Sequence, residues 1–525
     1  MKVLVSDSLA EEGINKLKEQ FTVDVITGLS EDELVEKIKD YDALVVRSGT
    51  NVTEKVINAA DNLKIVGRAG VGVDNIDVDA ATNKGIIVVN TPEGNMISAA
   101  EHTISMMMAM CRNIPQAHAS LKSKKWERKK FMGVEVNGKY LGVIGLGRIG
   151  SYVAQRGQAL HMKVLGYDPY VSQEQADEMG VELTSVEDIC KRADFITVHT
   201  PLTKGTENLI NADKFALMKD GVRVLNCARG GIINEDALAE ALRSGKVAGA
   251  AIDVFVEEPP FESPLLDFDN VITTPHLGAS TEEAQVNVAE AAADEVISAL
   301  TGGPVNNAIN IPTVKPEMMP ALTPYLKLAE TMGKFAGQLM TGNYKRVELE
   351  YSGDILDKDI KPVTVAALKG ILENALGPGV NFVNANSLAK SRKIKVIESK
   401  SETTNKFPST ITLELTRGSD TKSITGTVSG NGKIGRIIQI DGYHFDIVPT
   451  ENMLVVDHMN RPNVIGPCAI MLGKNDINIS GMQVGQVGLG EKTIMVLNVD
   501  SEVPESILNE MKSIEGILDA KPVTL

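Results

Sequence analysis

The segment GVIGLGRIG constrains the fold of this chain most, because its glycines stand in G-x-G-x-x-G spacing between a strand-like and a helix-like run. Gly145 permits a tight turn, Gly147 lets a pyrophosphate approach the backbone, and Gly150 lets the helix pack on the strand. The N-terminus of that helix offers unpaired N–H groups to phosphate. The segment therefore predicts a dinucleotide site, with Arg148 and Ile149 on its edge.

Asp168 ends the next predicted strand, 18 residues beyond Gly150. An acid near this spacing binds the ribose hydroxyls of NAD and repels the 2′-phosphate of NADP. The pattern therefore favours NAD, although a solvated turn aspartate is the alternative. His199, Thr200 and Pro201 end a later strand, where they are predicted to form the adenine wall.

Strand-like and helix-like runs alternate in two regions, which predicts parallel sheets covered by helices. In the first region the predicted strands are Lys2–Val5, Ala43–Arg47, Lys64–Gly67 and Ile86–Val89. In the second they are Tyr140–Ile144, Lys163–Tyr167, Phe195–His199, Val222–Asn226, Gly249–Asp253 and Val271–Thr274. The fold class is therefore α/β, with two Rossmann-like doubly wound domains.

A long helix is expected between these regions. Ser98 and Glu101 fit a capping box at its start. Four methionines follow, which we interpret as core or subunit interface: Met106, Met107, Met108 and Met110.

The C-terminal part has a different pattern. The segment IPTVKPEMMP predicts a linker, and residues 315–450 an α+β domain in which Glu398–Lys406 is a loop and Gly435–Gln439 and Tyr443–Val448 are strands. Residues 451–525 have the order βαββαβ, which predicts a ferredoxin-like sandwich.

Three segments that end predicted strands carry chemistry: NCARGG, DVFVEEPP and TPHLGAST. Because ligands bind at the carboxyl ends of parallel strands, their polar residues should meet in one crevice. His276 is predicted to accept a hydroxyl proton, Glu258 to orient its ring, and Arg229 to bind a carboxylate. Asp253 is predicted to accept a hydrogen bond from the nicotinamide carboxamide. Each residue taken singly could instead be structural.

The chain has a formal net charge of -16, which disfavours nucleic acid and anionic membranes as partners. Its four cysteines form no CxxC pair, so we expect reduced thiols, a cytoplasmic location and no metal site. No signal peptide and no apolar run of about 20 residues is apparent.

At these residues the chain resembles the long form of the D-isomer-specific 2-hydroxyacid dehydrogenases. The matching segments are VRSGT, GRAGVGVDNID, AAEHT, KWERKKFMGVEVNGK, LGVIGLGRIG, NCARGG, DVFVEEPP and TPHLGAST. The resemblance implies NAD as cofactor, Arg229, Glu258 and His276 as the catalytic set, and Ala228 and Gly278 beside the cofactor. It also implies a lid domain (1–97 with 283–312), an NAD-binding domain (98–282), an intervening domain (315–450) and a regulatory ACT domain (451–525).

The resemblance also implies a phosphorylated substrate, 3-phosphoglycerate, and a homo-oligomer, dimer or tetramer. Arg47 of R-S-x-T resembles a phosphate ligand, and the basic run Lys122–Lys130 either adds charge or is a solvated helix face. The further residues predicted to bind substrate are Ser48, Arg68, Gly70, Val71, Gly72 and Asn95.

In the ACT-like segment, His458, Asn460 and Asn478 match a pattern that contacts L-serine. Asn463 replaces the usual glycine, which puts serine inhibition in question, although asparagine tolerates the left-handed conformation. Two alternatives stay open for the whole chain: a glyoxylate or hydroxypyruvate reductase, and a dinucleotide-sensing binding protein.

Overall fold

The N-terminal sheet has five parallel strands in the order β2-β1-β3-β4-β5. The computed structural model describes residues 1–312, 314, 316–401, 407–429, 434–486 and 488–525. The strands are β1 (Lys2–Val5), β2 (Thr22–Val25), β3 (Ala43–Val46), β4 (Ile65–Arg68) and β5 (Ile87–Val89). The helices around them are α1 (Glu11–Lys18), α2 (Glu31–Lys37), α3 (Glu54–Ala59) and α4 (Val78–Lys84). The strand β2 was not predicted, because it is short and has no fully buried residue.

The second sheet has seven parallel strands in the order β12-β11-β10-β9-β6-β7-β8. They are β6 (Tyr140–Ile144), β7 (Lys163–Tyr167), β8 (Glu182–Leu183), β9 (Phe195–Val198), β10 (Val222–Asn226), β11 (Val247–Ile252) and β12 (Val271–Thr273). The order reverses between β6 and β9, and such a switch point opens a crevice at the carboxyl ends of the strands. The predicted α/β class with two Rossmann-like domains is confirmed.

Helices cover both faces of the second sheet, as its almost wholly buried strands require. They are α5 (Met96–Cys111), α7 (Arg148–Ala159), α8 (Gln173–Glu178), α9 (Val186–Arg192), α10 (Ala212–Leu217) and α11 (Glu235–Arg243). The short helix α6 (Ile114–Lys122) follows α5 and has no buried residue.

The predicted capping box on α5 is wrong. The helix begins at Met96, so Ser98 lies inside it and donates instead to the carbonyl of Gly278, 2.9 Å away. Glu101 pairs with Arg156 of α7. The prediction of a methionine core holds, since Met106, Met107 and Met110 are buried and Met108 is partly buried.

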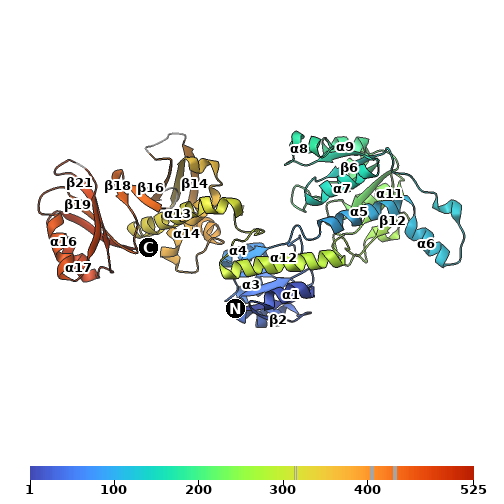
Figure 1. Cartoon of the computed structure of the whole chain (residues 1–525). Coiled ribbons are helices and arrows are strands. Elements are labelled where there is room, and N and C mark those ends of the chain that lie inside the picture. The colour runs from blue at the N-terminus through green and yellow to red at the C-terminus, as the bar shows by residue number, and fades with distance from the viewer. Residues whose placement is uncertain (313, 315, 402–406, 430–433, 487) are drawn as a thin grey trace.

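The long helix α12 (Glu282–Thr301) leaves the second sheet and packs on the first, against α1 and β4. Figure 1 shows α12 running along the N-terminal domain towards the NAD-binding domain. After α12 the chain stays on the first sheet, where Ala308 bridges to Val89 and Asn310 bonds the edge beside β5. The N-terminal domain is therefore built from two separate segments of the chain, one before the NAD-binding domain and one after it. The exact residue limits of the four domains remain a prediction.

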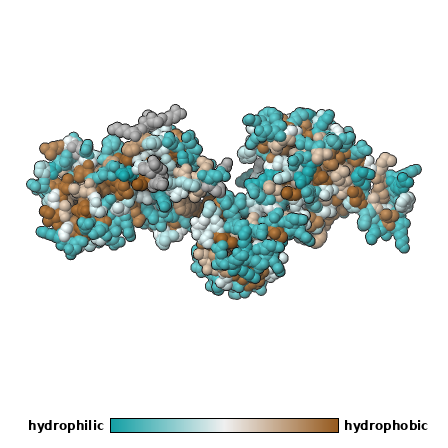
Figure 2. Space-filling model, viewed as in Figure 1, coloured by the Kyte–Doolittle hydropathy of each residue, from teal (hydrophilic) through white to brown (hydrophobic). Residues whose placement is uncertain are grey.

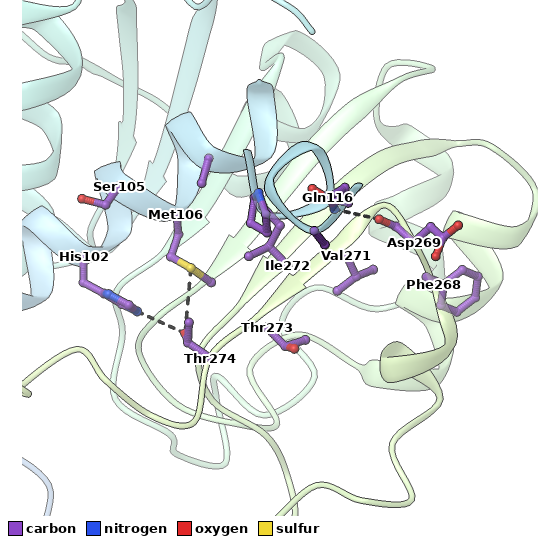
Figure 3. A pocket seen from close by; sticks show the side chains of 13 residues that line it. His102, Ser105, Met106, Gln116, Phe268, Asp269, Val271, Ile272, Thr273 and Thr274 are labelled. Atoms are coloured by element: carbon purple, nitrogen blue, oxygen red, sulfur yellow. Dashed lines mark hydrogen bonds between the residues drawn. The ribbon is translucent and has the colours of Figure 1, made fainter. Parts of the chain in front are cut away.

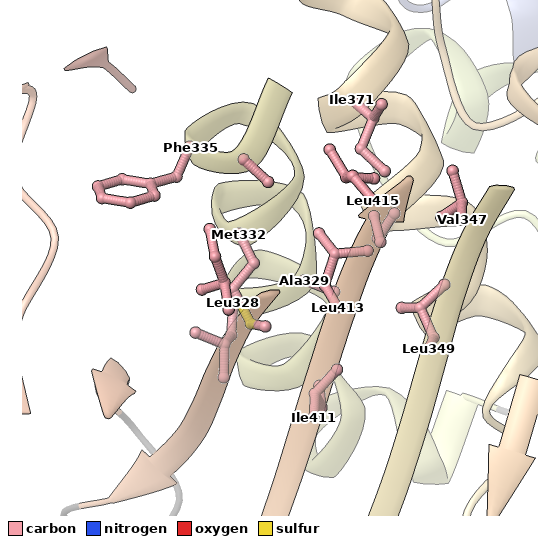
Figure 4. Packing of buried hydrophobic residues seen from close by; sticks show 14 of the residues in the cluster. Leu328, Ala329, Met332, Phe335, Val347, Leu349, Ile371, Ile411, Leu413 and Leu415 are labelled. Carbon is pink, nitrogen blue, oxygen red and sulfur yellow. The ribbon is translucent and has the colours of Figure 1, made fainter. Parts of the chain in front are cut away.

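The third sheet is mixed, in the order β14-β13-β15-β16-β17-β18. Its strands are β13 (Arg346–Gly353), β14 (Lys395–Ser401), β15 (Ser409–Arg417), β16 (Asp420–Ser429), β17 (Ile434–Ile440) and β18 (Tyr443–Ile447). The helices are α13 (Met319–Leu339), α14 (Lys361–Leu376) and α15 (Ala385–Ser391). Figure 4 shows α13 side chains such as Leu328 and Met332 beside the apolar residues of β13 and β15.

The predicted loop over Glu398–Lys406 is partly wrong, because 395–401 form β14, paired in parallel with β13. Residues 402–406 of that prediction, and 313 and 315 of the predicted linker, lie outside the described residues.

The last sheet has the order β20-β21-β19-β22, all antiparallel. Its elements are β19 (Asn452–Met459), α16 (Ile465–Lys474), β20 (Ile479–Val484), β21 (Lys492–Val499), α17 (Glu505–Lys512) and β22 (Ile517–Thr524), so the predicted βαββαβ order is confirmed. One face packs on α16 and α17 and the other on α13. On this side of the molecule, hydrophobic residues gather over the two C-terminal domains (Figure 2).

Candidate active site

The glycine turn joins β6 to α7 at the switch point. Gly145 has φ +97°, which favours glycine, and a Cβ on Gly150 would lie 1.8 Å from the carbonyl oxygen of Gly145. Gly147 is the N-cap of α7, and a Cβ there would meet no described atom within 4 Å. Two glycines therefore serve the turn itself, while Gly147 faces open space from which a phosphate can approach the helix N-terminus.

Asp168 follows β7 and holds this turn. Its Oδ2 accepts a hydrogen bond from the backbone N–H of Leu146 at 3.0 Å, and its Oδ1 accepts one from Tyr170 at 2.9 Å. The acid predicted to bind ribose thus also fixes the glycine loop, and this second role was not predicted.

A cleft of about 480 Å³ lies between the glycine turn and the N-terminal domain. Asn95 Oδ1, His199 Nδ1 and Thr200 Oγ1 are buried beside it and have no hydrogen-bond partner in the described part of the chain. Burial lowers the pKa of His199 to about 4, so this ring is neutral at physiological pH. Buried polar atoms normally have partners, so this lining fits the polar groups of a bound dinucleotide.

The cleft contains most of the residues predicted for cofactor and substrate. Those that line it are Val71, Gly72, Asn95, Arg148, Ile149, His199, Thr200, Pro201, Ala228, Arg229, Asp253, His276 and Gly278. Arg47, Ser48, Arg68 and Gly70 belong to neighbouring loops of the N-terminal domain and are not part of this lining.

His276 and Glu258 form a hydrogen-bonded pair at this cleft. Nδ1 of His276 lies 2.9 Å from Oε2 of Glu258, and Oε1 of Glu258 accepts from the backbone N–H of Phe255. Because the carboxylate holds Nδ1, Nε2 is the ring nitrogen left to exchange a proton with a ligand. The pair thus has the geometry of an oriented acid–base catalyst.

Asp253 anchors the loop that carries His276. This side chain is fully buried, and its carboxylate accepts from the hydroxyl of Thr274 at 2.6 Å and the backbone N–H groups of Leu277 and Gly278 at 2.7 and 2.9 Å. Burial alone would raise the pKa of Asp253, but it is lowered overall, first by the contact with the ring of His102 and then by the bonds from Thr274 and Leu277. The predicted bond from Asp253 to a carboxamide stays a prediction, and the role of Thr274 was missed.

Arg229 follows β10 and reaches across to the N-terminal domain. Its Nε lies 3.1 Å from Oδ2 of Asp74, and its Nη1 donates to the carbonyl of Ala228. Asn226 holds this loop by bonding the backbone of Ala228 and Arg229. A Cβ on Gly72 would lie 1.8 Å from Nη2 of Arg229, so the guanidinium lies against the 70–74 loop. Asp74 and Asn226 were not predicted.

Arg68 and Arg47 stand near Arg229. Burial, and then the charges of Arg229 and Arg47, lower the pKa of Arg68 to about 10. Nε of Arg68 is buried and has no hydrogen-bond partner in the described part of the chain. Arg47 donates to the carbonyl of Ser8, while Asp7 fixes its loop. Three guanidinium groups gathered in this way favour an anionic ligand.

The residues predicted to contact serine do not converge within one chain. His458 is buried near the end of β19, with Nδ1 3.0 Å from the carbonyl of Met459 and Nε2 without a partner in the described residues. Asn460 donates to Gly488, and Asn478 lies by Asp500, next to the β20 residue that pairs with Val499 at the far end of the sheet. Asn463 has φ +64°, so the prediction of a left-handed residue is confirmed.

Residues 104–278 match the D-isomer specific 2-hydroxyacid dehydrogenase NAD binding domain, and residues 321–441 match the D-3-phosphoglycerate dehydrogenase intervening domain. The chain is 49% identical over 525 residues to the D-3-phosphoglycerate dehydrogenase of Synechocystis sp., covering all of this chain and 95% of that one. It is 48% identical to that of Methanocaldococcus jannaschii, covering 100% of both.

Solved structures resemble more than half of the chain. The D-lactate dehydrogenase from Aquifex aeolicus, complexed with NAD and lactic acid, is 31% identical, with TM-score 0.53 over 57% of this chain and 96% of that one. A glyoxylate reductase from Paecilomyes thermophila is 29% identical, with TM-score 0.55 over 61% and 99%.

Fold, cleft and comparisons together define an NAD-dependent 2-hydroxyacid dehydrogenase. Within this class, the chain belongs to the D-3-phosphoglycerate dehydrogenase family, since full-length relatives of that name share nearly half of its residues.

Proposed function

We propose that this enzyme oxidises 3-phospho-D-glycerate to 3-phosphohydroxypyruvate with NAD, the first step of L-serine synthesis. The observation that carries the proposal is that Arg229 lines the same cleft as His276, with Arg68 close enough to Arg229 and Arg47 for their charges to interact. A substrate with both a carboxylate and a phosphate needs several cations near one acid–base catalyst. The names of the full-length relatives support the same substrate.

In the proposed mechanism, Nε2 of His276 takes the proton of the substrate hydroxyl, and Glu258 stabilises the imidazolium that forms. Arg229 binds the carboxylate and polarises the forming carbonyl. The acid–base step is typically worth about 10²–10⁴ in rate. NAD, held at the glycine turn and by the cleft residues around Ala228, Asp253 and Gly278, would supply the hydride acceptor for the carbon that bears the hydroxyl. Arg47 and Arg68 hold the phosphate, with Ser48 and the backbone at Gly70, Val71 and Gly72.

The test follows reduced nicotinamide by absorbance with 3-phosphoglycerate and with unphosphorylated glycerate. We expect turnover of the phosphorylated acid, and His276→Ala should abolish it while leaving NAD affinity nearly unchanged. Arg47→Ala should raise KM for the phosphorylated acid much more than for glycerate. Equal effects on both acids would remove the reason for proposing a phosphate site.

The alternatives are separable in the same assay. The glyoxylate reductase matches 61% of this chain, whereas residues 321–441 match the intervening domain of D-3-phosphoglycerate dehydrogenase, which supports the phosphorylated substrate. Turnover of glyoxylate in preference to phosphohydroxypyruvate would favour a reductase. Tight dinucleotide binding without turnover of any acid would favour a sensor.

The cofactor assignment includes NAD specificity. Asp168 and the exposed Tyr170 beside it supply no cation for a 2′-phosphate. We therefore assign the ribose to Asp168, the adenine wall to His199, Thr200 and Pro201, and the nicotinamide end to Ala228, Asp253 and Gly278. Steady-state kinetics should give a much lower KM for NAD than for NADP.

We also infer feedback regulation by L-serine at the ACT domain. His458 offers a buried ring nitrogen, and Asn463 keeps the loop conformation that a glycine would allow. Because Asn478 lies at the other end of the sheet, the site needs two ACT domains, with His458 and Asn460 from one and Asn478 from the other. Serine should inhibit the wild type, and Asn478→Ala should relieve inhibition without changing basal turnover.

A homo-oligomer, dimer or tetramer, is part of the same proposal. The segment around α6 projects from the NAD-binding domain (Figure 1) and has no buried helical residue. It exposes 77% of Trp126, inside the basic run Lys122–Lys130, and 82% of Met132, just after it. Such an apolar surface favours a partner. Analytical sedimentation should give the mass of a dimer or tetramer, and the variant Trp126→Glu should shift the protein towards a smaller mass.

We propose a cytoplasmic location, supported by four free, buried cysteines. Among the described residues, no helix is long and apolar enough to span a membrane.

A further inference from the structure

A second cavity lies next to the catalytic loop, between helices α5 and α6 and strand β12. This groove of about 570 Å³ is lined by α5, α6 and β12 with its flanking residues. Figure 3 shows the side chains of His102, Met106 and Thr274 close together on the wall of this groove. His102 and Thr274 line the groove, whereas Asp253 and His276 line the cleft. One layer of side chains therefore separates the two cavities.

Hydrogen bonds cross that layer. Nε2 of His102 lies 3.2 Å from both Oδ1 of Asp253 and Oγ1 of Thr274, and the Thr274 hydroxyl donates to the same Oδ1 at 2.6 Å. Asp253 in turn holds the backbone N–H groups of Leu277 and Gly278. His102 thus reaches the catalytic loop through one buried carboxylate.

The loop needs such support because of its backbone. His276 has φ +56°, a left-handed conformation that a side-chain-bearing residue adopts at a cost. Its own N–H donates to the backbone carbonyls of Asp253 and Thr274. The same helix α5 also bonds Gly278 through Ser98. Helix α5 therefore holds the catalytic loop through two side chains, Ser98 and His102.

We propose that His102 is a positioning residue for hydride transfer: its Nε2–H fixes Asp253, and Asp253 fixes the strained loop that aims His276 at the substrate. The inference rests on the proposed function, because it takes His276 as the acid–base catalyst. A base displaced by a fraction of an ångström slows the chemical step more than it weakens substrate binding.

The experiment compares His102→Leu, which removes the donor, with His102→Gln, which keeps an N–H at similar reach. We expect kcat of the leucine variant to fall by roughly 10- to 100-fold with little change in KM for NAD. Substrate labelled with deuterium at the oxidised carbon should show a larger isotope effect on kcat in the leucine variant, because hydride transfer becomes the rate-limiting step. The glutamine variant should recover most of the loss.

Two further variants control for a general effect on the helix. Ser105→Ala lies on the same groove wall and should match the wild type. Thr274→Val removes the other donor to Oδ1, and its loss should be non-additive with that of His102→Leu because both act through Asp253.

Wild-type turnover tests the proposed function independently. If the wild type is active, an unchanged kcat and isotope effect in His102→Leu would overturn the inference. The inference would also be overturned if His102→Gln had a kcat no higher than that of His102→Leu. If the wild type oxidises no hydroxy acid, the proposed function fails instead.

Discussion

Nε of Arg229 lies 3.1 Å from Oδ2 of Asp74, across the cleft between the NAD-binding domain and the N-terminal domain. The two residues are separated by 155 positions in sequence. Arg229 is the arginine proposed to bind the substrate carboxylate, so Asp74 places a competing carboxylate on it. An anion that enters the cleft meets a guanidinium that is already partly paired.

We therefore predict that Asp74→Asn lowers KM for the acid substrate. The pair is largely exposed on the Asp74 side, and such pairs are worth about 0–1 kcal/mol, which corresponds to a change in KM of up to about fivefold. Steady-state kinetics with phosphorylated and unphosphorylated acids should show the decrease for both. Asp79→Asn, an exposed acid at the start of α4, makes the same charge change away from the cleft and serves as control. A raised KM in Asp74→Asn alone would contradict the competition argument.

The glycine turn predicts opposite outcomes for two alanine variants. Gly150→Ala puts a methyl group 1.8 Å from a backbone oxygen, so the turn must move, and we expect both Tm and NAD affinity to fall. Gly147→Ala meets no described atom within 4 Å, so Tm should stay within a few degrees while NAD affinity falls at least tenfold. Thermal melting and NAD titration by protein fluorescence measure both quantities. Equal Tm losses in the two variants would show that Gly147 serves the fold and not the cofactor.

Much of the fold and of the site could be predicted because the signals are local. Each strand of the second sheet that was predicted is a short apolar run, and parallel strands place their carboxyl ends at one edge. That rule alone brought Arg229 and His276 to one cleft. The strand β14 was missed because its polar residues lie at a sheet edge, where backbone pairing with β13 suffices.

The missing parts of the site depend on contacts between distant segments. Asp74 reads as a solvated loop acid until Arg229 is placed beside it. Ser98 fits a helix cap by spacing, but its partner is the carbonyl of Gly278, 180 residues later. His102 and Thr274 lie in the matching segments AAEHT and TPHLGAST, but those segments do not show that both side chains contact the buried carboxylate of Asp253.

Because Glu258 contacts His276, we predict that a substitution of Glu258 lowers catalysis and leaves the protein folded. Glu258→Gln keeps a hydrogen-bond acceptor for Nδ1–H but removes the charge that stabilises the imidazolium, so kcat should fall by roughly 10²-fold or more. Rapid-mixing and steady-state rates measure the loss, and circular dichroism checks the fold. Glu257→Gln, its neighbour in sequence, is the matched control. Comparable rates for the two variants would remove Glu258 from the catalytic set.

His199 predicts how stability depends on pH in the enzyme without cofactor. Its pKa is about 4 in the folded protein, against 6.5 for the free side chain. Above pH 6.5 neither state is protonated, whereas between 6.5 and 4 the unfolded chain takes up a proton that the folded chain refuses. Folding is therefore destabilised as the pH falls through this window, by at most about 3 kcal/mol. Melting curves at pH 7.5 and pH 5 should show a smaller drop in Tm for His199→Gln than for the wild type. His444→Gln, at an exposed strand position, should follow the wild type. The same drop in all three proteins would mean that the ring of His199 is protonated in the folded enzyme.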